Sequence, residues 1–166
     1  AHLKTILDIQ AIRNAGIMVV HDAMYGAGQG VLAEILGADR VIEHRCSINP
    51  GFGGTPPEPI ERNLNQLKDL ITQKGCDAAI ANDGDADRIG MSDEHGDFVD
   101  SHRLLALLVD YLHSDKGLSG SVVKTFSTTD MLDKLCLDLG LSLETTAIGF
   151  KYIGEKFLNG DVLVGG

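Results

Sequence analysis

The sequence has little positive charge. It contains 14 Lys and Arg residues against 24 Asp and Glu residues, which gives a net charge of −10 at pH 7. Because a nucleic-acid-binding surface needs a basic stripe to neutralise phosphates, this balance argues against nucleic acid as a partner, and we expect none. A few placed cationic groups could still hold a small phosphorylated ligand.

Long hydrophobic runs are also absent. No apolar run approaches the ~18 residues of a membrane-spanning helix, and the start has no signal-peptide pattern, so we expect no membrane partner. The three cysteines, Cys46, Cys76 and Cys136, lack any Cys-x-x-Cys spacing. This usage favours reduced structural thiols, and we therefore expect a cytoplasmic location.

Strand and helix patterns alternate along the chain. Residues 3–13 form an amphipathic helical pattern, and later apolar runs alternate with helical ones, which predicts an α/β fold with a mainly parallel sheet. The turn-rich segment SDKGLSG at 114–120 predicts a linker. We expect one α/β domain over residues 1–113, with the hairpin 89–99 as an antiparallel edge. A second α/β unit, over residues 121–166, is expected to be truncated because it is too short to close a core.

The stretch ANDGDADRIGMSD, residues 81–93, places three carboxylates on one short loop. Asp83, Asp85 and Asp87 alternate with small residues, and Arg88 follows. Two such charges ~4 Å apart repel by about 4 kcal/mol at an effective dielectric near 20, and a nearby cation reverses that repulsion. The loop also follows a strand of an α/β sheet, where ligand sites concentrate. We therefore expect a hard divalent cation here, with Arg88 as a contact for a phosphate.

Two other interpretations of this loop fit it less well. An EF-hand would need Gly at its sixth position, where Arg88 stands, and helices rather than strands on either side. A solvated acidic turn without a ligand would leave the repulsion among the carboxylates uncompensated. A metal site for phosphate chemistry is therefore the favoured interpretation.

Several segments together resemble the α-D-phosphohexomutases, the phosphoglucomutase/phosphomannomutase family. DGDADR between AAIAN and IGMSDEHG looks like the family's metal-binding loop, and VVHDAMYGAG and NPGFGGTPPEPIERNL resemble other parts of its domain 2. AIGFKYI and VLVGG resemble the first part of domain 3. The resemblance covers nearly the whole chain and implies a three-layer α/β/α domain followed by part of a second domain of the same type.

The resemblance also implies roles for individual residues. Asp83, Asp85 and Asp87 would bind Mg²⁺, and Arg88 would contact the active-site phosphate. The remaining expected substrate contacts match positions in domain 3, namely Lys124, Gly149 and Lys151. The expected activity is interconversion of hexose 1-phosphate and hexose 6-phosphate, with glucose or mannose phosphate as substrate, through a phosphoserine and a bisphosphate intermediate.

The phosphoserine of this family belongs to domain 1, so the resemblance places no catalytic serine in these residues. We expect that the chain is a piece of a longer protein, inactive alone and able to self-associate through its truncated part. Two alternatives stay open. One is a non-catalytic Ca²⁺-binding module, and the other, less favoured, is a DxD phosphatase of the haloacid-dehalogenase type.

Overall fold

A computed structural model describes residues 7–166 of the chain. The fold divides into two compact units, one ending at Asp100 and the other comprising Ser101–Gly166. The helix predicted over residues 3–13 lies partly outside the described residues, and its described part contains α2, Ile9–Asn14. No helix within residues 7–166 is long and apolar enough to cross a membrane.

The first unit contains a five-stranded sheet and short helices. In chain order its further elements are β1 (Val19–Asp22), α3 (Val31–Leu36), β2 (Val41–His44), the 3-10 turns Phe52–Gly54 and Glu61–Asn63, α4 (Asn65–Lys74), β3 (Ala78–Asn82), β4 (Ile89–Ser92) and β5 (Phe98–Val99). Leu64, whose φ is −113°, separates the second 3-10 turn from α4.

The strand order of this sheet is β2-β1-β3-β4-β5. β1 pairs in parallel with both β2 and β3, whereas β3–β4 and β4–β5 are antiparallel. The hairpin predicted over 89–99 is confirmed as the antiparallel edge. The sheet is therefore mixed, with parallel strands on one side and the hairpin on the other.

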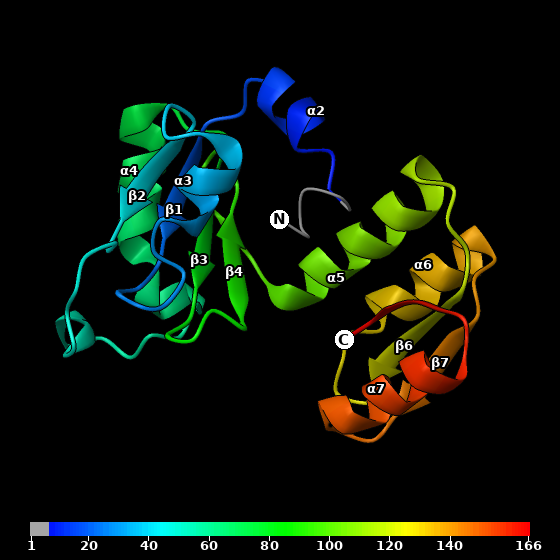
Figure 1. Ribbon diagram of the computed structural model, residues 1–166. Coiled ribbons are helices and arrows are strands. Elements are labelled where there is room, and N and C mark those ends of the chain that lie inside the picture. Colours follow the sequence, from blue (N-terminus) through cyan, green and yellow to red (C-terminus); the bar gives the residue numbers. More distant parts are fainter. Residues whose placement is uncertain (1–6) are drawn as a thin grey trace. The chain divides into compact units, whose positions relative to one another are not determined.

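The two faces of the first sheet are covered by different helices (Figure 1), with α3 on one face and α4 on the other. Successive side chains of a strand point to opposite faces. Val20 and Ala79 therefore face α4, where they join Leu67 and Ile71 in the buried core. His21, between these alternate positions, faces the α3 side. The expected three-layer α/β/α arrangement is confirmed.

The second unit is a smaller α/β layer. Its elements are α5 (Ser101–Asp110), a π-helical turn (Tyr111–Asp115), β6 (Ser121–Thr125), α6 (Met131–Leu139), β7 (Leu143–Thr146), α7 (Phe150–Asn159) and β8 (Val162–Gly165). The strand order is β7-β6-β8, and both pairings are parallel. This second parallel sheet confirms the prediction that the β-α pattern restarts after the first unit.

The boundary between the units differs from the expected linker at 114–120. It lies at Asp100 and Ser101 because α5 packs with the second sheet: its Ala106 and Val109 are buried in one cluster with Val122 and Leu132. The start of the expected linker continues α5 as the π-helical turn. Local turn signals could not reveal which sheet would bury this amphipathic helix.

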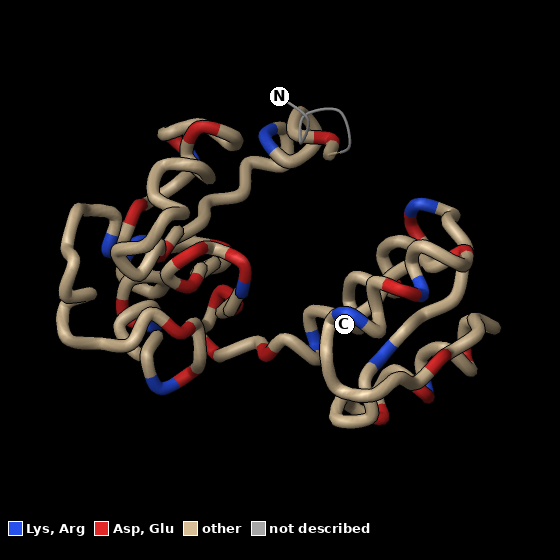
Figure 2. The backbone as a smooth tube through the Cα atoms, turned by 60° about the horizontal axis from the view of Figure 1, so that its bottom comes forward, with Lys and Arg blue, Asp and Glu red and all other residues tan. Residues whose placement is uncertain are grey.

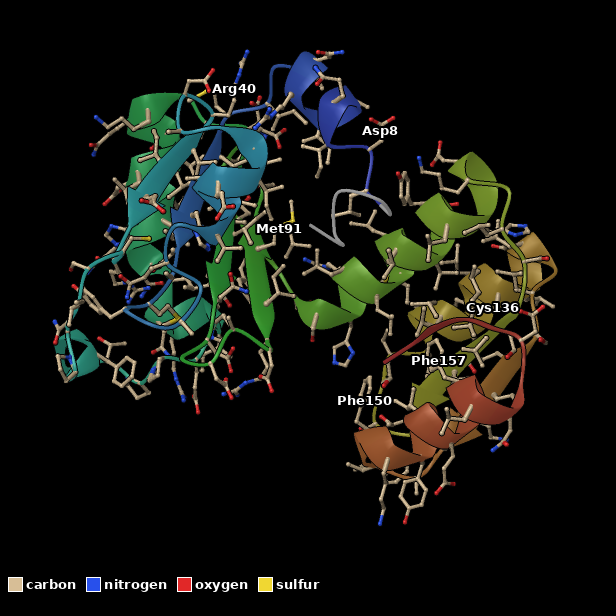
Figure 3. All side chains as sticks on the ribbon, viewed as in Figure 1. Asp8, Arg40, Met91, Cys136, Phe150 and Phe157 are labelled. Atoms are coloured by element: carbon tan, nitrogen blue, oxygen red, sulfur yellow. The ribbon has the colours of Figure 1, made fainter. Side chains whose placement is uncertain are left out.

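The second unit closes a core of its own once α5 is included, yet it keeps large apolar side chains on its surface. Phe150 projects from the start of α7 (Figure 3) and is 71% exposed, and Leu137 and Leu158 are 80% and 86% exposed. The expectation that residues 121–166 could not close a core overlooked α5, which completes it, although these individual apolar side chains remain exposed.

Replacing Gly154 by alanine should stabilise the second unit. Gly154 lies inside α7, and a Cβ built on it meets no atom within 4 Å. Because glycine in a helix interior costs about 0.5–1 kcal/mol relative to alanine, the variant should melt at a higher temperature in circular dichroism. Gly165→Ala is the contrasting control, since its Cβ would lie 2.6 Å from Ile153 Cγ2. A lower melting temperature for Gly154→Ala would contradict the expectation.

Candidate metal centre

The acidic loop, residues 83–88, connects β3 to β4 at the carboxyl end of β3. The parallel strand β1 ends at the same edge of the sheet, which is where open α/β sheets place their ligands. Two backbone hydrogen bonds close the loop: Asp83 N–H donates to Arg88 O at 3.4 Å, and Ala86 N–H donates to Asp83 O at 3.2 Å. Ala86 completes the turn with a left-handed φ of 64°.

The three carboxylates of this loop converge. One carboxylate oxygen from each of Asp83, Asp85 and Asp87 lies within 4.8 Å of the other two. Asp83 is buried at 1% exposure, whereas the other two are exposed. The buried member is fixed by its surroundings, and the two exposed members can adjust around a ligand.

Arg88 orients the buried carboxylate. Its backbone N–H donates to Asp83 Oδ1 at 2.9 Å, and its Nε donates to Asp83 Oδ2 at 2.7 Å. Burial raises the pKa of Asp83, but the hydrogen bonds from Arg88 outweigh it and hold the pKa at about 2. Asp83 is therefore ionised at neutral pH. The Arg88 side chain remains 60% exposed, so it could also contact an anion.

The exposed end of the loop carries unfavourable charge. Repulsion from Asp85 and Asp83 raises the pKa of Asp87. The Arg88 side chain compensates only weakly there, since its Nε lies 3.9 Å from Asp87 Oδ1. A divalent cation among the three carboxylates would replace this repulsion with attraction.

The donor set fits Mg²⁺. Hard cations take carboxylate oxygens, and Mg–O distances of about 2.0–2.1 Å place ligand oxygens up to about 4.2 Å apart. The carboxylate oxygens lie within 4.8 Å of one another, so small side-chain rotations would bring them to that spacing. Water and a phosphate oxygen could complete the shell, as is usual for Mg²⁺.

A second loop, residues 23–28 after β1, supports the acidic loop. Ala27 N–H donates to Gly84 O at 3.0 Å. A Cβ built on Gly26 would lie 2.6 Å from Gly84 O and 2.8 Å from Asp83 O. The two main chains therefore meet at a position that only glycine can occupy.

Asn82, the last residue of β3, joins the acidic loop to β1. Its Nδ2 donates to Arg88 O at 3.3 Å, and its Oδ1 lies 3.1 Å from His21 Nε2. A hollow of about 290 Å³ lies beside this contact and reaches Asp85 at the acidic loop. The Asn82 side chain therefore supports the acidic loop from the end of β3. The sequence pattern does not single out this residue.

The other predicted contacts lie in the second unit. Lys124 on β6 is buried at 4% exposure. Its Nζ forms an ion pair with Asp133 of α6 and donates to Thr129 O at 3.2 Å. The ammonium group of Lys124, which was expected to contact substrate, is therefore bound to residues of its own unit in this structure.

Gly149 and Lys151 lie at the start of α7, after the carboxyl end of β7. Gly149 precedes the helix with a φ of 133°, a conformation that favours glycine. Lys151 is exposed, and its Nζ lies 4.7 Å from the centre of the Tyr152 ring. Both residues are therefore at the edge of the second sheet that ligands would use.

One buried ion pair near the first site was not anticipated. Asp22 at the end of β1 is fully buried and bonds to Arg45, whose side chain is 9% exposed. Arg45 Nε lies 2.9 Å from Asp22 Oδ1, and Nη2 donates to Asn63 O at 3.1 Å. These two residues are more than twenty positions apart in the sequence. The one sequence signal for the ion pair is the presence of an acidic residue, Asp22, at the end of an apolar strand.

The charged residues of both units are shown in Figure 2, where acidic positions outnumber basic ones along the whole backbone. No broad basic surface accompanies the acidic loop among the described residues. Any phosphate bound at this site would therefore depend on a bound cation together with Arg88.

Family models match almost the entire chain. The model described as phosphoglucomutase/phosphomannomutase, alpha/beta/alpha domain II, matches residues 1–96, and the corresponding domain III model matches residues 100–166. The junction between the two matches agrees with the division at Asp100 and Ser101.

Individual proteins give the same result. A phosphoglucomutase/phosphomannomutase of Thermococcus kodakarensis is 30% identical over 99% of this chain and 36% of its own length. A phosphoglucosamine mutase of Methylococcus capsulatus is 30% identical over 92% of this chain and 34% of its own length. The crystal structure of a Thermus thermophilus protein assigned as a phosphomannomutase superposes with a TM-score of 0.90 at 38% identity, covering 99% of this chain and 38% of that one. The chain thus spans about a third of the length of the curated relatives that it matches.

Proposed function

The chain belongs to the phosphoglucomutase/phosphomannomutase family, and from this premise we propose that it supplies the Mg²⁺ site of a phosphohexomutase. The observation that carries the proposal is the convergence of Asp83, Asp85 and Asp87, with one oxygen of each within 4.8 Å of the others. The reaction would interconvert hexose 1-phosphate and hexose 6-phosphate. Relatives named for glucose, mannose and glucosamine phosphates support a hexose phosphate as the substrate class.

The bound Mg²⁺ would supply positive charge to a phosphoryl group during transfer. The residues of this chain hold and orient that charge. Asp83 stays ionised because Arg88 donates to both of its oxygens, and Asp85 and Asp87 would supply the other two carboxylate ligands. Arg88 remains exposed enough to contact a phosphate oxygen as well.

The second unit would contribute contacts to the sugar phosphate. Gly149 and Lys151 lie at the start of α7, where the Lys151 ammonium is accessible. Lys124 could contact substrate only after its Nζ leaves Asp133. We propose that the exposed apolar side chains of this unit support self-association, and that the protein acts in the cytoplasm.

We expect this chain to bind Mg²⁺ without catalysing the mutase reaction. The carboxylates lie within one loop of a closed unit, so the site can form locally, but phosphoryl transfer also needs a positioned donor. No serine here stands in the expected phosphoserine context. Calorimetry should detect weak Mg²⁺ binding that Asp85→Asn removes, and an assay with glucose 1-phosphate, glucose 1,6-bisphosphate and Mg²⁺ should show no turnover.

Turnover by the chain above that of Asp85→Asn would overturn the proposal that catalysis requires further domains. Tight Ca²⁺ binding with no response to Mg²⁺ would favour the calcium-binding module instead. A positive test of the proposed role uses glucose 1,6-bisphosphate binding followed by NMR. The amide signal of Arg88 should shift only when Mg²⁺ is present. Lys74→Gln, an exposed position at the end of α4 before the start of β3, should leave that shift unchanged.

A further inference from the structure

A second group of side chains that could bind a metal ion lies on the face of the first sheet opposite to the α4 core. His21, Glu43 and Cys46 each place one ligand atom within 4.8 Å of the other two. His21 and Glu43 are paired positions of the parallel strands β1 and β2, so their side chains leave the sheet on the same face. None of the three takes part in the acidic loop.

The backbone after β2 explains how Cys46 joins this group. Arg45 has a left-handed φ of 46°, which ends the alternation of the strand. The Arg45 side chain consequently turns to Asp22, on the face opposite to His21, and Cys46 returns to the His21 side. The Cys46 thiol lies 3.2 Å from His44 O, a weak contact that a metal ion could replace.

The hydrogen bonds of Asn82 assign the protonation of His21. Because Asn82 Nδ2 donates to Arg88 O, its Oδ1 is the atom that faces His21. His21 Nε2, at 3.1 Å from this oxygen, must therefore carry the proton. In the neutral imidazole the other nitrogen, Nδ1, then holds a lone pair.

That lone pair is buried without a hydrogen-bond partner. His21 is 2% exposed, and its Nδ1 has no partner among the described residues. Buried polar atoms in native proteins are nearly always satisfied, so each exception calls for an explanation. A ligand between His21, the thiol and the Glu43 carboxylate would satisfy it.

We propose that His21 Nδ1, Glu43 and Cys46 form a second metal site, which binds Zn²⁺. Imidazole, carboxylate and thiolate are the donors that Zn²⁺ takes, whereas Mg²⁺ prefers oxygen alone. Three protein ligands leave the fourth position to water. Binding displaces the thiol proton of Cys46 to solvent, because the thiolate is the ligand.

The surroundings of His21 match this assignment. A histidine that binds a metal usually donates its other N–H to a carboxylate, a carbonyl or water, which fixes the ring. Here the Nε2–H donates to the side-chain carbonyl of Asn82. Asn82 lies just before the acidic loop and also donates to Arg88 O at its end. An ion bound to His21 would therefore stabilise both ends of the acidic loop through Asn82.

The site can be tested on the whole chain with Co²⁺ as a probe for Zn²⁺. A cobalt–thiolate bond gives a charge-transfer absorption in the near ultraviolet, which a site made of carboxylates alone cannot produce. We expect this band in the unaltered chain, its loss on addition of Zn²⁺, and its persistence in excess Mg²⁺. Cys46→Ser should abolish the band, whereas Cys136→Ser, on α6 of the second unit (Figure 3), should keep it.

A second pair of variants tests the exposed ligand without disturbing the core. Glu43→Gln should weaken Zn²⁺ binding by about tenfold or more, while Glu34→Gln, another exposed glutamate of the same unit, should leave it unchanged. Asp85→Asn should also keep the cobalt band, because the acidic loop is a separate site. The proposal is overturned if the unaltered chain gives no band, if Cys46→Ser retains it, or if Asp85→Asn removes it.

Discussion

Replacing Arg45 by methionine is expected to lower the free energy of unfolding of the first unit by about 3–5 kcal/mol. The substitution leaves the Asp22 carboxylate in a site where it is fully buried and where Arg45 is its ionic partner. It also removes the hydrogen bond from Arg45 Nη2 to Asn63 O, which links β2 to the turn before α4. Urea denaturation followed by NMR signals of the first unit measures this loss separately from the second unit.

Two further variants sharpen this measurement. Arg45→Lys keeps the charge but not the planar fork, so it should lose less stability than Arg45→Met. Arg62→Met removes an arginine that is 76% exposed and lies 3.8 Å from Glu58, and a surface pair of this kind contributes at most about 1 kcal/mol. Equal stability of Arg45→Met and Arg62→Met would show that the buried pair does not stabilise the fold in this way.

Replacing Gly26 by alanine should weaken Mg²⁺ binding at the acidic loop by about tenfold or more, the scale seen when a group that positions metal ligands is lost. The new Cβ would lie 2.6 Å from Gly84 O and 2.8 Å from both Asp83 O and Gly84 Cα. All three are main-chain atoms, so the loop itself must move. Calorimetric titration of Mg²⁺ into the variant measures the effect.

Gly28→Ala is the matched control in the same loop. Its Cβ would meet side-chain atoms of Asn82 and Ala86 at 3.4–3.6 Å, which is ordinary contact. This variant should bind Mg²⁺ as the unaltered chain does. If Gly26→Ala also bound Mg²⁺ normally, the acidic loop would not depend on the close approach of residues 23–28.

The acidic loop could be located from sequence because its information is local. Three carboxylates at alternate positions, small residues between them and apolar strands on both sides all lie within residues 78–92. The structure places this loop at the end of β3 with the three carboxylates together, as expected. The identity of the ion stays a prediction, since Mg²⁺ and Ca²⁺ use the same oxygen donors.

Features that depend on distant pairing were not predictable in the same way. The strand β1 includes His21 and Asp22, and these two residues face opposite sides of the sheet. The parallel pairing of β1 and β2 brings Glu43 beside His21 and places Arg45, just after β2, against Asp22. Only the register reveals that His21 lies beside Glu43 while Asp22 lies within reach of Arg45.

Lys124 shows the same limit for the second unit. The family resemblance predicts a substrate contact for Lys124, but the sequence does not show that α6 brings Asp133 to its ammonium group. The role of α5 was missed for a related reason. Its leucine-rich stripe predicts that one face is buried, but not whether the preceding or the following sheet buries it.

The junction at Asp100 and Ser101 also marks where the first unit could be exchanged between related proteins as a whole. The described core residues of that unit, from Met18 to Phe98, all precede the junction, so a gene fusion that ends at Asp100 carries every one of them. A fusion point placed inside α5 would instead separate Val109 from Val122 and Leu132. Recombination between related genes should therefore be tolerated at this junction, and chimaeras that exchange the metal-binding unit should be joined there.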